Sequence, residues 1–148
     1  MTLYLARYLL PISAPPIEDG ALLVDKGRIA AVGRRAQLLS EYGGEVVDFG
    51  EAALLPTLVN AHSHLELSHF PRWATRAGEQ DPPATFVDWL LRLIRIKREL
   101  TSAELNASIA DGLRQCLQSG TGAVGDILSR VVLPPDYAAS PLYGRVFL

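Results

Sequence analysis

The segment from Leu54 to Ala61 constrains the fold of this chain more than any other. It is an almost unbroken apolar run without the alternation of a half-exposed strand, and it leads directly into His62-Ser63-His64. Such runs are typical of strands buried on both faces, as in parallel sheets. In α/β proteins, ligand sites lie at the carboxyl ends of parallel strands. The pattern therefore predicts a buried parallel strand with histidines at its tip.

Two helices are predicted after a loop at 69–84, which is rich in proline and polar residues. Thr85 is a suitable N-cap for an amphipathic helix over 86–100. Thr101 and Glu104 form a capping-box pattern, in which a hydroxyl and a carboxylate each bind a backbone N–H of the other residue. This pattern predicts the start of a second helix.

Two further strands are predicted in the second half of the chain. One covers 121–128, after Gly120 ends the second helix, and the other covers 143–148. A strand, two helices and two more strands in this order imply right-handed parallel βα units. Because no helix follows to cover the last strand, we expect the chain to be the front part of something larger.

The first 55 residues are predicted to be mostly β. Gly27 can supply the positive φ of a hairpin turn, and a short helix is expected over 34–41. The strand-like runs lie at 3–10, 21–24, 28–32, 45–49 and 52–55.

Composition excludes several classes of protein. The 148 residues carry 14 lysines and arginines against 16 aspartates and glutamates, so we expect no nucleic-acid partner. No apolar run approaches the roughly 20 residues of a membrane span, and no secretory signal is recognised, so we expect no membrane partner and a cytoplasmic location. The single Cys116 excludes a disulfide framework and a cysteine-based zinc site.

The histidine pair is the candidate for chemistry. Side chains two residues apart on a strand share a face, so His62 and His64 are expected to project together. A His-x-His pattern alone is weak and can be a chance pair on a polar loop. Its place at the tip of a buried strand favours half of a metal site instead.

The residues around this pair resemble a known family. The segment 54–66 is similar to the first barrel strand of the amidohydrolase superfamily, most of all to its cytosine-deaminase-like, chlorohydrolase and aminohydrolase branch. Residues 86–90 resemble the helix after that strand, and 120–126 resemble the second strand. Thr57 departs from the family, which usually has glycine there, and a β-branched residue is tolerated if φ stays negative.

The resemblance implies an α/β fold with a small N-terminal β-sandwich portion over 1–55. Over 56–148 it implies the first βα units of a TIM-type (β/α)8 barrel, truncated because a whole barrel needs roughly 250 residues. It further implies one divalent metal ion, zinc in preference to iron, with His62 and His64 as its first two ligands. The remaining ligands and the catalytic acid and base lie outside this sequence, so the chain alone is expected to be inactive.

The activity implied by the resemblance is hydrolytic deamination of a small-molecule substrate by metal-activated water. The substrate would be an amino-substituted heterocycle or a nucleoside-like compound. Dechlorination and cyclic amide hydrolysis remain open, because the first barrel strand does not distinguish them. A different hypothesis is a non-catalytic module that associates through its exposed third strand. A homo-oligomer or the remainder of the barrel would then be its partner.

Three further residues are candidates for the site. Glu66 follows His64 by two residues and is predicted either to contact substrate or to be a loop residue in water. Asp126 ends the second predicted barrel strand, where it could orient a ligand histidine or cap a turn. His69 lies in the predicted loop and receives no role.

Other conspicuous residues are expected to be structural. Phe86 and Trp89 are assigned to the core by their helical spacing, and Cys116 is expected to be an inert core thiol. A solvated outer helix face is expected for the basic residues Arg92, Arg95, Lys97 and Arg98.

Overall fold

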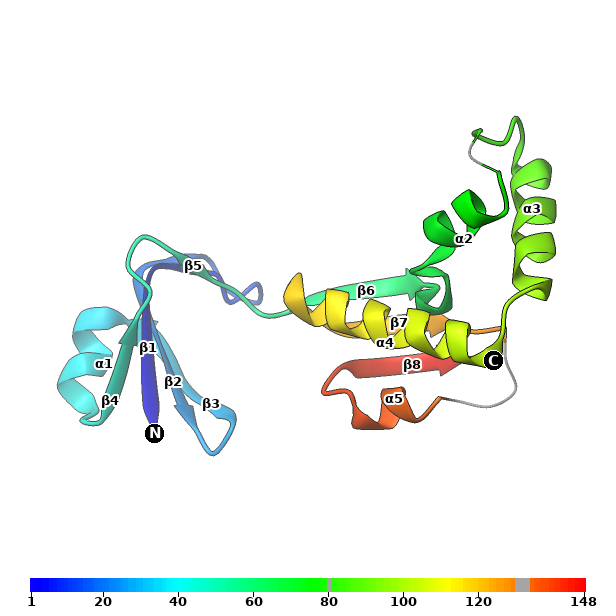
Figure 1. Ribbon diagram of the computed structural model, residues 1–148. Helices are drawn as coiled ribbons and strands as arrows, with labels where there is room; N and C mark the ends of the chain where they lie inside the picture. Colours follow the sequence, from blue (N-terminus) through cyan, green and yellow to red (C-terminus); the bar gives the residue numbers. More distant parts are fainter. Residues whose placement is uncertain (80, 130–133) are drawn as a thin grey trace. The chain divides into compact units, whose positions relative to one another are not determined.

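The computed structural model describes residues 1–79, 81–129 and 134–148 (Figure 1). The chain forms two compact units, Met1–Pro56 and Thr57–Leu148, which are described separately. None of the helices in the described residues is long and apolar enough to cross a lipid bilayer.

The first unit is a mixed sheet with one helix. Its strand order is β3-β2-β1-β4, and β5 also pairs with β1. β1 is antiparallel to β2 and parallel to β4 and β5, and β2 is antiparallel to β3. The elements are β1 (Thr2–Leu9), β2 (Ile17–Asp25), β3 (Arg28–Arg34), α1 (Arg35–Glu41), β4 (Glu45–Asp48) and β5 (Ala53–Leu54).

The helix α1 closes one face of this sheet. Leu38 of α1 is buried against Leu3 and Leu5 of β1 and against Leu23 of β2. The turn between β2 and β3 follows the sequence prediction, because Gly27 has a φ of 73°. Positive φ suits the tight turn of a hairpin and is allowed at glycine without strain.

The second unit is a parallel sheet with helices. Within the described residues the strand order is β6-β7-β8. The strands are β6 (Leu58–Ser63), β7 (Thr121–Ile127) and β8 (Tyr143–Phe147). The helical segments are η1 (Leu65–Leu67), α2 (Phe70–Arg76), α3 (Phe86–Arg98), α4 (Ser102–Gln118) and α5 (Pro135–Ala139).

The predicted fold class is confirmed. The chain combines an N-terminal β-rich unit with a parallel α/β unit, as expected. α4 is the crossover helix between β6 and β7, and its buried Ile109 and Leu113 pack against Leu65 and Leu128. α2 and α3 form an excursion between β6 and this crossover helix, beyond the carboxyl end of β6 (Figure 1).

The predicted helix caps are also confirmed. The Thr85 hydroxyl accepts a hydrogen bond from the Asp88 backbone N–H, at the start of α3. Thr101 and Glu104 form both bonds of the capping box at the start of α4. Each cap satisfies N–H groups that have no partner within the first turn of a helix.

The prediction of a loop over 69–84 is wrong in part, because this range contains α2. Pro71 lies in the first turn of α2, where proline costs no hydrogen bond. Trp73 and Ala74 of α2 are buried against Ile96 of α3, and this contact stabilises a helix that its composition did not indicate.

The prediction that β6 is buried on both faces is wrong for this chain. Five of its six residues are exposed, and Val59 has 71% of its surface accessible. β6 is an edge strand of the described sheet, and the crossover helix α4 packs mainly on η1 and β7. Thr57, just before β6, is not among the described residues with positive φ, as its β-branched side chain requires.

The assignment of Phe86 and Trp89 to the core is also wrong. Phe86 is 72% exposed, and Trp89 is half-buried and stacks on it with the ring centroids 5.6 Å apart. The packed side of α3 is the side that carries Ile96, and Phe86 lies outside it. The opposite side of the helix also exposes apolar residues, namely Val87, Leu90, Leu91 and Ile94.

Candidate metal-binding site at the end of the parallel sheet

His62 and His64 lie together at the carboxyl end of β6. Their ring centroids are 5.2 Å apart, with the ring planes at 75°, and both residues are exposed. The structure therefore brings the two imidazoles together on one side of the strand, as the alternation of side chains predicts.

The residue between the two histidines points the other way. Ser63 is 9% exposed, and its hydroxyl donates a hydrogen bond of 2.8 Å to Oδ1 of Asp126, at the end of β7. The same Oδ1 accepts from the backbone N–H of Leu65, also at 2.8 Å. Asp126 therefore bonds to the residues on both sides of His64, to the side chain of Ser63 and to the backbone of Leu65.

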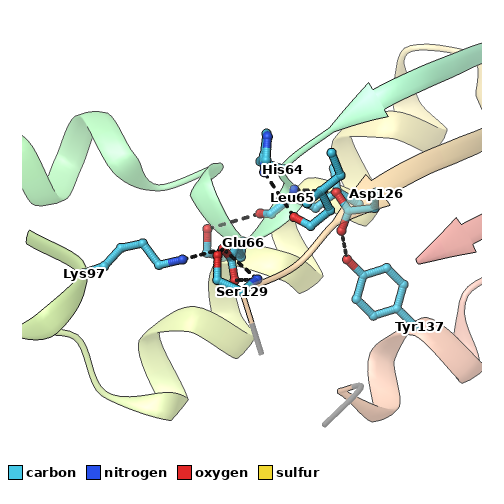
Figure 2. A network of polar contacts seen from close by, with 9 residues as sticks. His64, Leu65, Glu66, Lys97, Asp126, Ser129 and Tyr137 are labelled. Carbon is cyan, nitrogen blue, oxygen red and sulfur yellow. Dashed lines mark hydrogen bonds and ion pairs between the residues drawn. The ribbon is translucent and has the colours of Figure 1, made fainter. Parts of the chain in front are cut away.

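A third group completes the contacts of Asp126. The Tyr137 hydroxyl, from α5, donates to Oδ2 of Asp126 (Figure 2). Burial, and then this hydrogen bond to a carboxylate, raise the pKa of Tyr137 above its ordinary value. Asp126 itself has no exposed surface. Its buried carboxylate is thus satisfied by a hydroxyl, a backbone amide and a phenol.

The tautomer of His64 follows from its neighbour on β7. Its Nδ1 lies 3.1 Å from the backbone carbonyl oxygen of Ile127. Because a carbonyl oxygen can only accept, Nδ1 carries the proton in this contact. The lone pair of His64 is then on Nε2, which is the arrangement that metal-binding histidines use.

The strand pairing is irregular beside the histidines. The β6–β7 register shifts between Asn60 and Ser63. Gly125 of β7 allows a close approach at this point, since a Cβ there would lie 2.5 Å from the carbonyl oxygen of Ala61. This neighbour is backbone and cannot move aside easily, so glycine is needed at position 125.

Glu66 occupies a buried network next to the histidine pair. Its side chain is 1% exposed, and Oε1 lies 2.5 Å from Nζ of Lys97 on α3. The Ser129 hydroxyl donates to the same oxygen at 2.9 Å. Figure 2 shows Lys97 and Ser129 converging on Glu66. The alternative of a loop residue in water is therefore wrong, while the predicted contact with substrate stays a prediction.

His69 has partners of its own. Its Nε2 lies 2.7 Å from Oδ2 of Asp111 on α4, and its backbone N–H donates to the Ser108 hydroxyl at 3.0 Å. Arg114, and then His69, lower the pKa of Asp111. His69 lies at the start of α2 rather than in a loop. These contacts account for its position without a ligand.

The basic residues of α3 are not a simple solvated face, which corrects the prediction. The Lys97 side chain is 20% exposed because it reaches Glu66. The Arg92 side chain is 12% exposed, with Nε 3.1 Å from Oε2 of Glu79. Cys116 is half-buried beside the α4 core, and burial raises the pKa of its thiol; that this thiol is inert stays a prediction.

Sequence reasoning missed Ser63, Lys97, Ser129 and Tyr137 as parts of these networks. For Ser63 a signal existed, because the middle residue of His-x-His on a strand must face away from the histidines. No comparable signal marks the other three.

In the described residues, no group of three or more histidine, cysteine, aspartate or glutamate side chains is arranged to hold a metal ion. The pair is therefore at most part of a site.

The chain is similar in sequence to known proteins. The chain is 34% identical over 113 residues to the 5-methylthioadenosine/S-adenosylhomocysteine deaminase of Nitratidesulfovibrio vulgaris strain Hildenborough, which covers 75% of the chain and 24% of that protein. The region 20–44 matches the imidazolonepropionase-like composite domain of bacteria. The chain spans about a quarter of the length of the curated relatives it matches.

Solved structures agree on the fold. Helicobacter pylori aminofutalosine deaminase, in complex with methylthio-coformycin, superposes with a TM-score of 0.79 and 23% identity over 100% of this chain and 35% of that one. The atrazine chlorohydrolase of Arthrobacter aurescens TC1, complexed with zinc, gives a TM-score of 0.67 and 20% identity over 86% of this chain and 29% of that one. The chain thus matches the N-terminal portion of proteins of the amidohydrolase superfamily.

Proposed function

We propose that this chain provides the first metal-binding strand of a metal-dependent hydrolase that acts on C–N bonds other than peptide bonds. The proposed reaction is hydrolytic deamination of an amino-substituted heterocycle or a nucleoside-like small molecule. The observation that carries the proposal is the pair of imidazoles, 5.2 Å apart at the carboxyl end of β6. The relationship to a nucleoside deaminase supports the substrate class.

The donor set fits a zinc ion, as far as this chain supplies it. Neutral imidazole nitrogen is a common zinc ligand, and the hydrogen bond from Nδ1 of His64 to Ile127 leaves Nε2 available. His62, whose ring lies beside it, would supply the second nitrogen. When bound, the ion supplies a water activated as a nucleophile at neutral pH.

The chain's own residues bind and orient in this proposal. His62 and His64 hold the ion, and the Ile127 carbonyl fixes the ring of His64. The further ligands and the group that protonates the leaving amine would come from the remainder of the barrel. The excursion formed by α2 and α3 lies at the carboxyl end of the sheet, where loops of barrel enzymes contact substrate.

A second candidate is the activity of the imidazolonepropionases. The match of residues 20–44 to their composite domain favours it, as does 35% identity over 94 residues to the imidazolonepropionase of Solibacter usitatus. Both candidates use the same histidine pair. They are separated by supplying 5-methylthioadenosine or imidazolonepropionate to the enzyme that contains this strand.

The metal-binding role is tested by titrating the purified chain with Zn²⁺ in competition with a chromophoric chelator. The wild-type chain should bind zinc, and the double variant His62→Ala, His64→Ala should not. The matched control is His69→Ala, because His69 is a third imidazole that bonds to Asp111 instead. It should bind zinc as the wild type does. Equal binding by the wild type and the double variant would remove both ligand assignments.

A further inference from the structure

We infer that Asp126 is a positioning residue that sets the geometry of the His62–His64 pair from the buried side of β6. The inference rests on the proposed function, since a fixed geometry matters because the pair holds a metal. The inferred role differs from that of a carboxylate that bonds directly to one histidine ring. Asp126 touches neither imidazole, and it acts through the residues before and after His64.

The contacts define a clamp around His64. Oδ1 of Asp126 accepts from the Ser63 hydroxyl and from the Leu65 backbone N–H, each at 2.8 Å. These two residues flank His64 in sequence, so the clamp restrains the segment that carries it. The next residue of β7, Ile127, offers the carbonyl that accepts from Nδ1 of His64. Two consecutive residues of β7 therefore restrain the segment and the ring of one ligand.

The position of this clamp explains why it is needed. β6 is an edge strand, and its pairing with β7 is irregular between Asn60 and Ser63. The ladder is therefore interrupted beside the histidines, between the pairs Asn60–Val124 and Ser63–Asp126. The buried carboxylate adds side-chain bonds there, and Tyr137 fixes that carboxylate through its second oxygen (Figure 2).

The hydrogen bonds of Asp126 do not require its negative charge. Ser63 and Leu65 both donate to Oδ1, while Tyr137 donates to Oδ2. An asparagine at this position can keep its amide oxygen where Oδ1 is now, and its NH₂ group can donate to the Tyr137 oxygen. Asp126→Asn should thus preserve the clamp without the charge, whereas Asp126→Ala removes it entirely.

The first experiment measures Zn²⁺ affinity of the full chain with a competing chromophoric chelator. Asp126→Ala should weaken binding roughly 10- to 100-fold, as loss of partners behind a metal ligand commonly does. Asp126→Asn should stay within about threefold of the wild type. Thr101→Ala is the control for general destabilisation, because it removes the α4 cap and leaves the clamp intact.

The second measurement does not depend on metal. Nitrogen NMR of labelled histidines in the metal-free chain reports which ring nitrogen of His64 is protonated. The wild type and Asp126→Asn should show the proton on Nδ1. Asp126→Ala should show a mixture of tautomers, because the ring is no longer held against Ile127.

The outcomes separate this inference from the proposed function. If the wild-type chain binds no zinc, the proposed function is contradicted. If Asp126→Ala still loses the Nδ1 tautomer of His64 that the wild type shows, the clamp is supported. Zinc binding that is within twofold of wild type in folded Asp126→Ala overturns the clamp. Equal losses in Asp126→Asn and Asp126→Ala also overturn it, because charge would then be the cause. If Asp126→Ala does not fold, Ser63→Ala decides, since it removes one of the two bonds and should weaken binding severalfold.

Discussion

Two carboxylates are fully buried at the carboxyl end of the parallel sheet, and their partners differ in kind. Glu66 is 1% exposed and pairs with the ammonium group of Lys97. Asp126 has no exposed surface, and its hydrogen-bond donors in the described part of the chain are uncharged. A buried carboxylate without partners costs several kcal/mol, so both sets of contacts are needed.

The two carboxylates are therefore held by different parts of the unit. Asp126 receives its bonds from Ser63 at the end of β6, from the backbone of Leu65 just after it and from Tyr137, so it joins β7 to the end of β6. Glu66 depends on a long, flexible lysine from α3, which belongs to the excursion beyond β6. The Asp126 contacts therefore lie at the end of the sheet, while the contact of Glu66 with Lys97 changes if α3 moves. The following variants test whether the two carboxylates respond as differently as this comparison requires.

The largest effect is expected from Lys97→Met, which leaves Glu66 buried without its cation. Loss of one member of a buried ion pair typically costs about 3–5 kcal/mol of unfolding free energy. Urea denaturation followed by circular dichroism measures the change. The double variant Lys97→Met, Glu66→Gln should recover much of the loss, since no charge then remains buried.

The control for this prediction is the neighbouring exposed residue, Arg98. Arg98→Met should change the unfolding free energy by less than about 0.5 kcal/mol, as exposed substitutions usually do. Similar losses in Arg98→Met and Lys97→Met would show that the Glu66 pair contributes little.

A smaller effect is expected from Tyr137→Phe. This change removes one donor to Asp126 and leaves the Ser63 and Leu65 donors in place. A hydrogen bond to a charged group contributes about 1.5–3 kcal/mol, and the remaining partners keep the loss near the lower value. Thermal and urea unfolding should both show it. Tyr143→Phe is the matched control, because Tyr143 is 81% exposed, and a loss as large in that variant would contradict the prediction.

The fold could be predicted from sequence wherever the signal is local. The caps at Thr85 and Thr101, and the positive φ at Gly27, depend on neighbouring residues and were predicted correctly. Burial depends on which other segments are present, and it was predicted less well. β6 has the composition of a doubly covered strand, yet it is an exposed edge. Likewise α2 forms because Trp73 packs on α3, a contact that no local pattern indicates.

In the candidate site, too, local features could be predicted from the sequence and long-range contacts could not. The juxtaposition of His62 and His64 follows from the two-residue period of a strand and could be predicted. The clamp on Asp126 joins residues more than 60 positions apart, and the Glu66–Lys97 pair joins residues 31 apart. Such pairings arise from the register of β6 against β7 and from the path of α3. Neither quantity is encoded in a short motif.

A third, half-buried carboxylate, Glu104, is expected to contribute least to stability. The pKa of Glu104 is lowered from 4.5 to about 2, first by the Thr101 backbone N–H, then by the Arg76 guanidinium and the Thr101 hydroxyl. Since the folded pKa lies below the unfolded value, the stabilisation is present above about pH 4.5 and is lost as pH falls toward about 2. Glu104→Gln should therefore lower stability at neutral pH and flatten its decline in acid. Because water screens the ion pair of this half-buried group with the exposed Arg76, the effect should be the smallest of the three. Urea unfolding at a series of pH values measures it, with Glu99→Gln as an exposed control, and parallel wild-type and Glu104→Gln curves would contradict it.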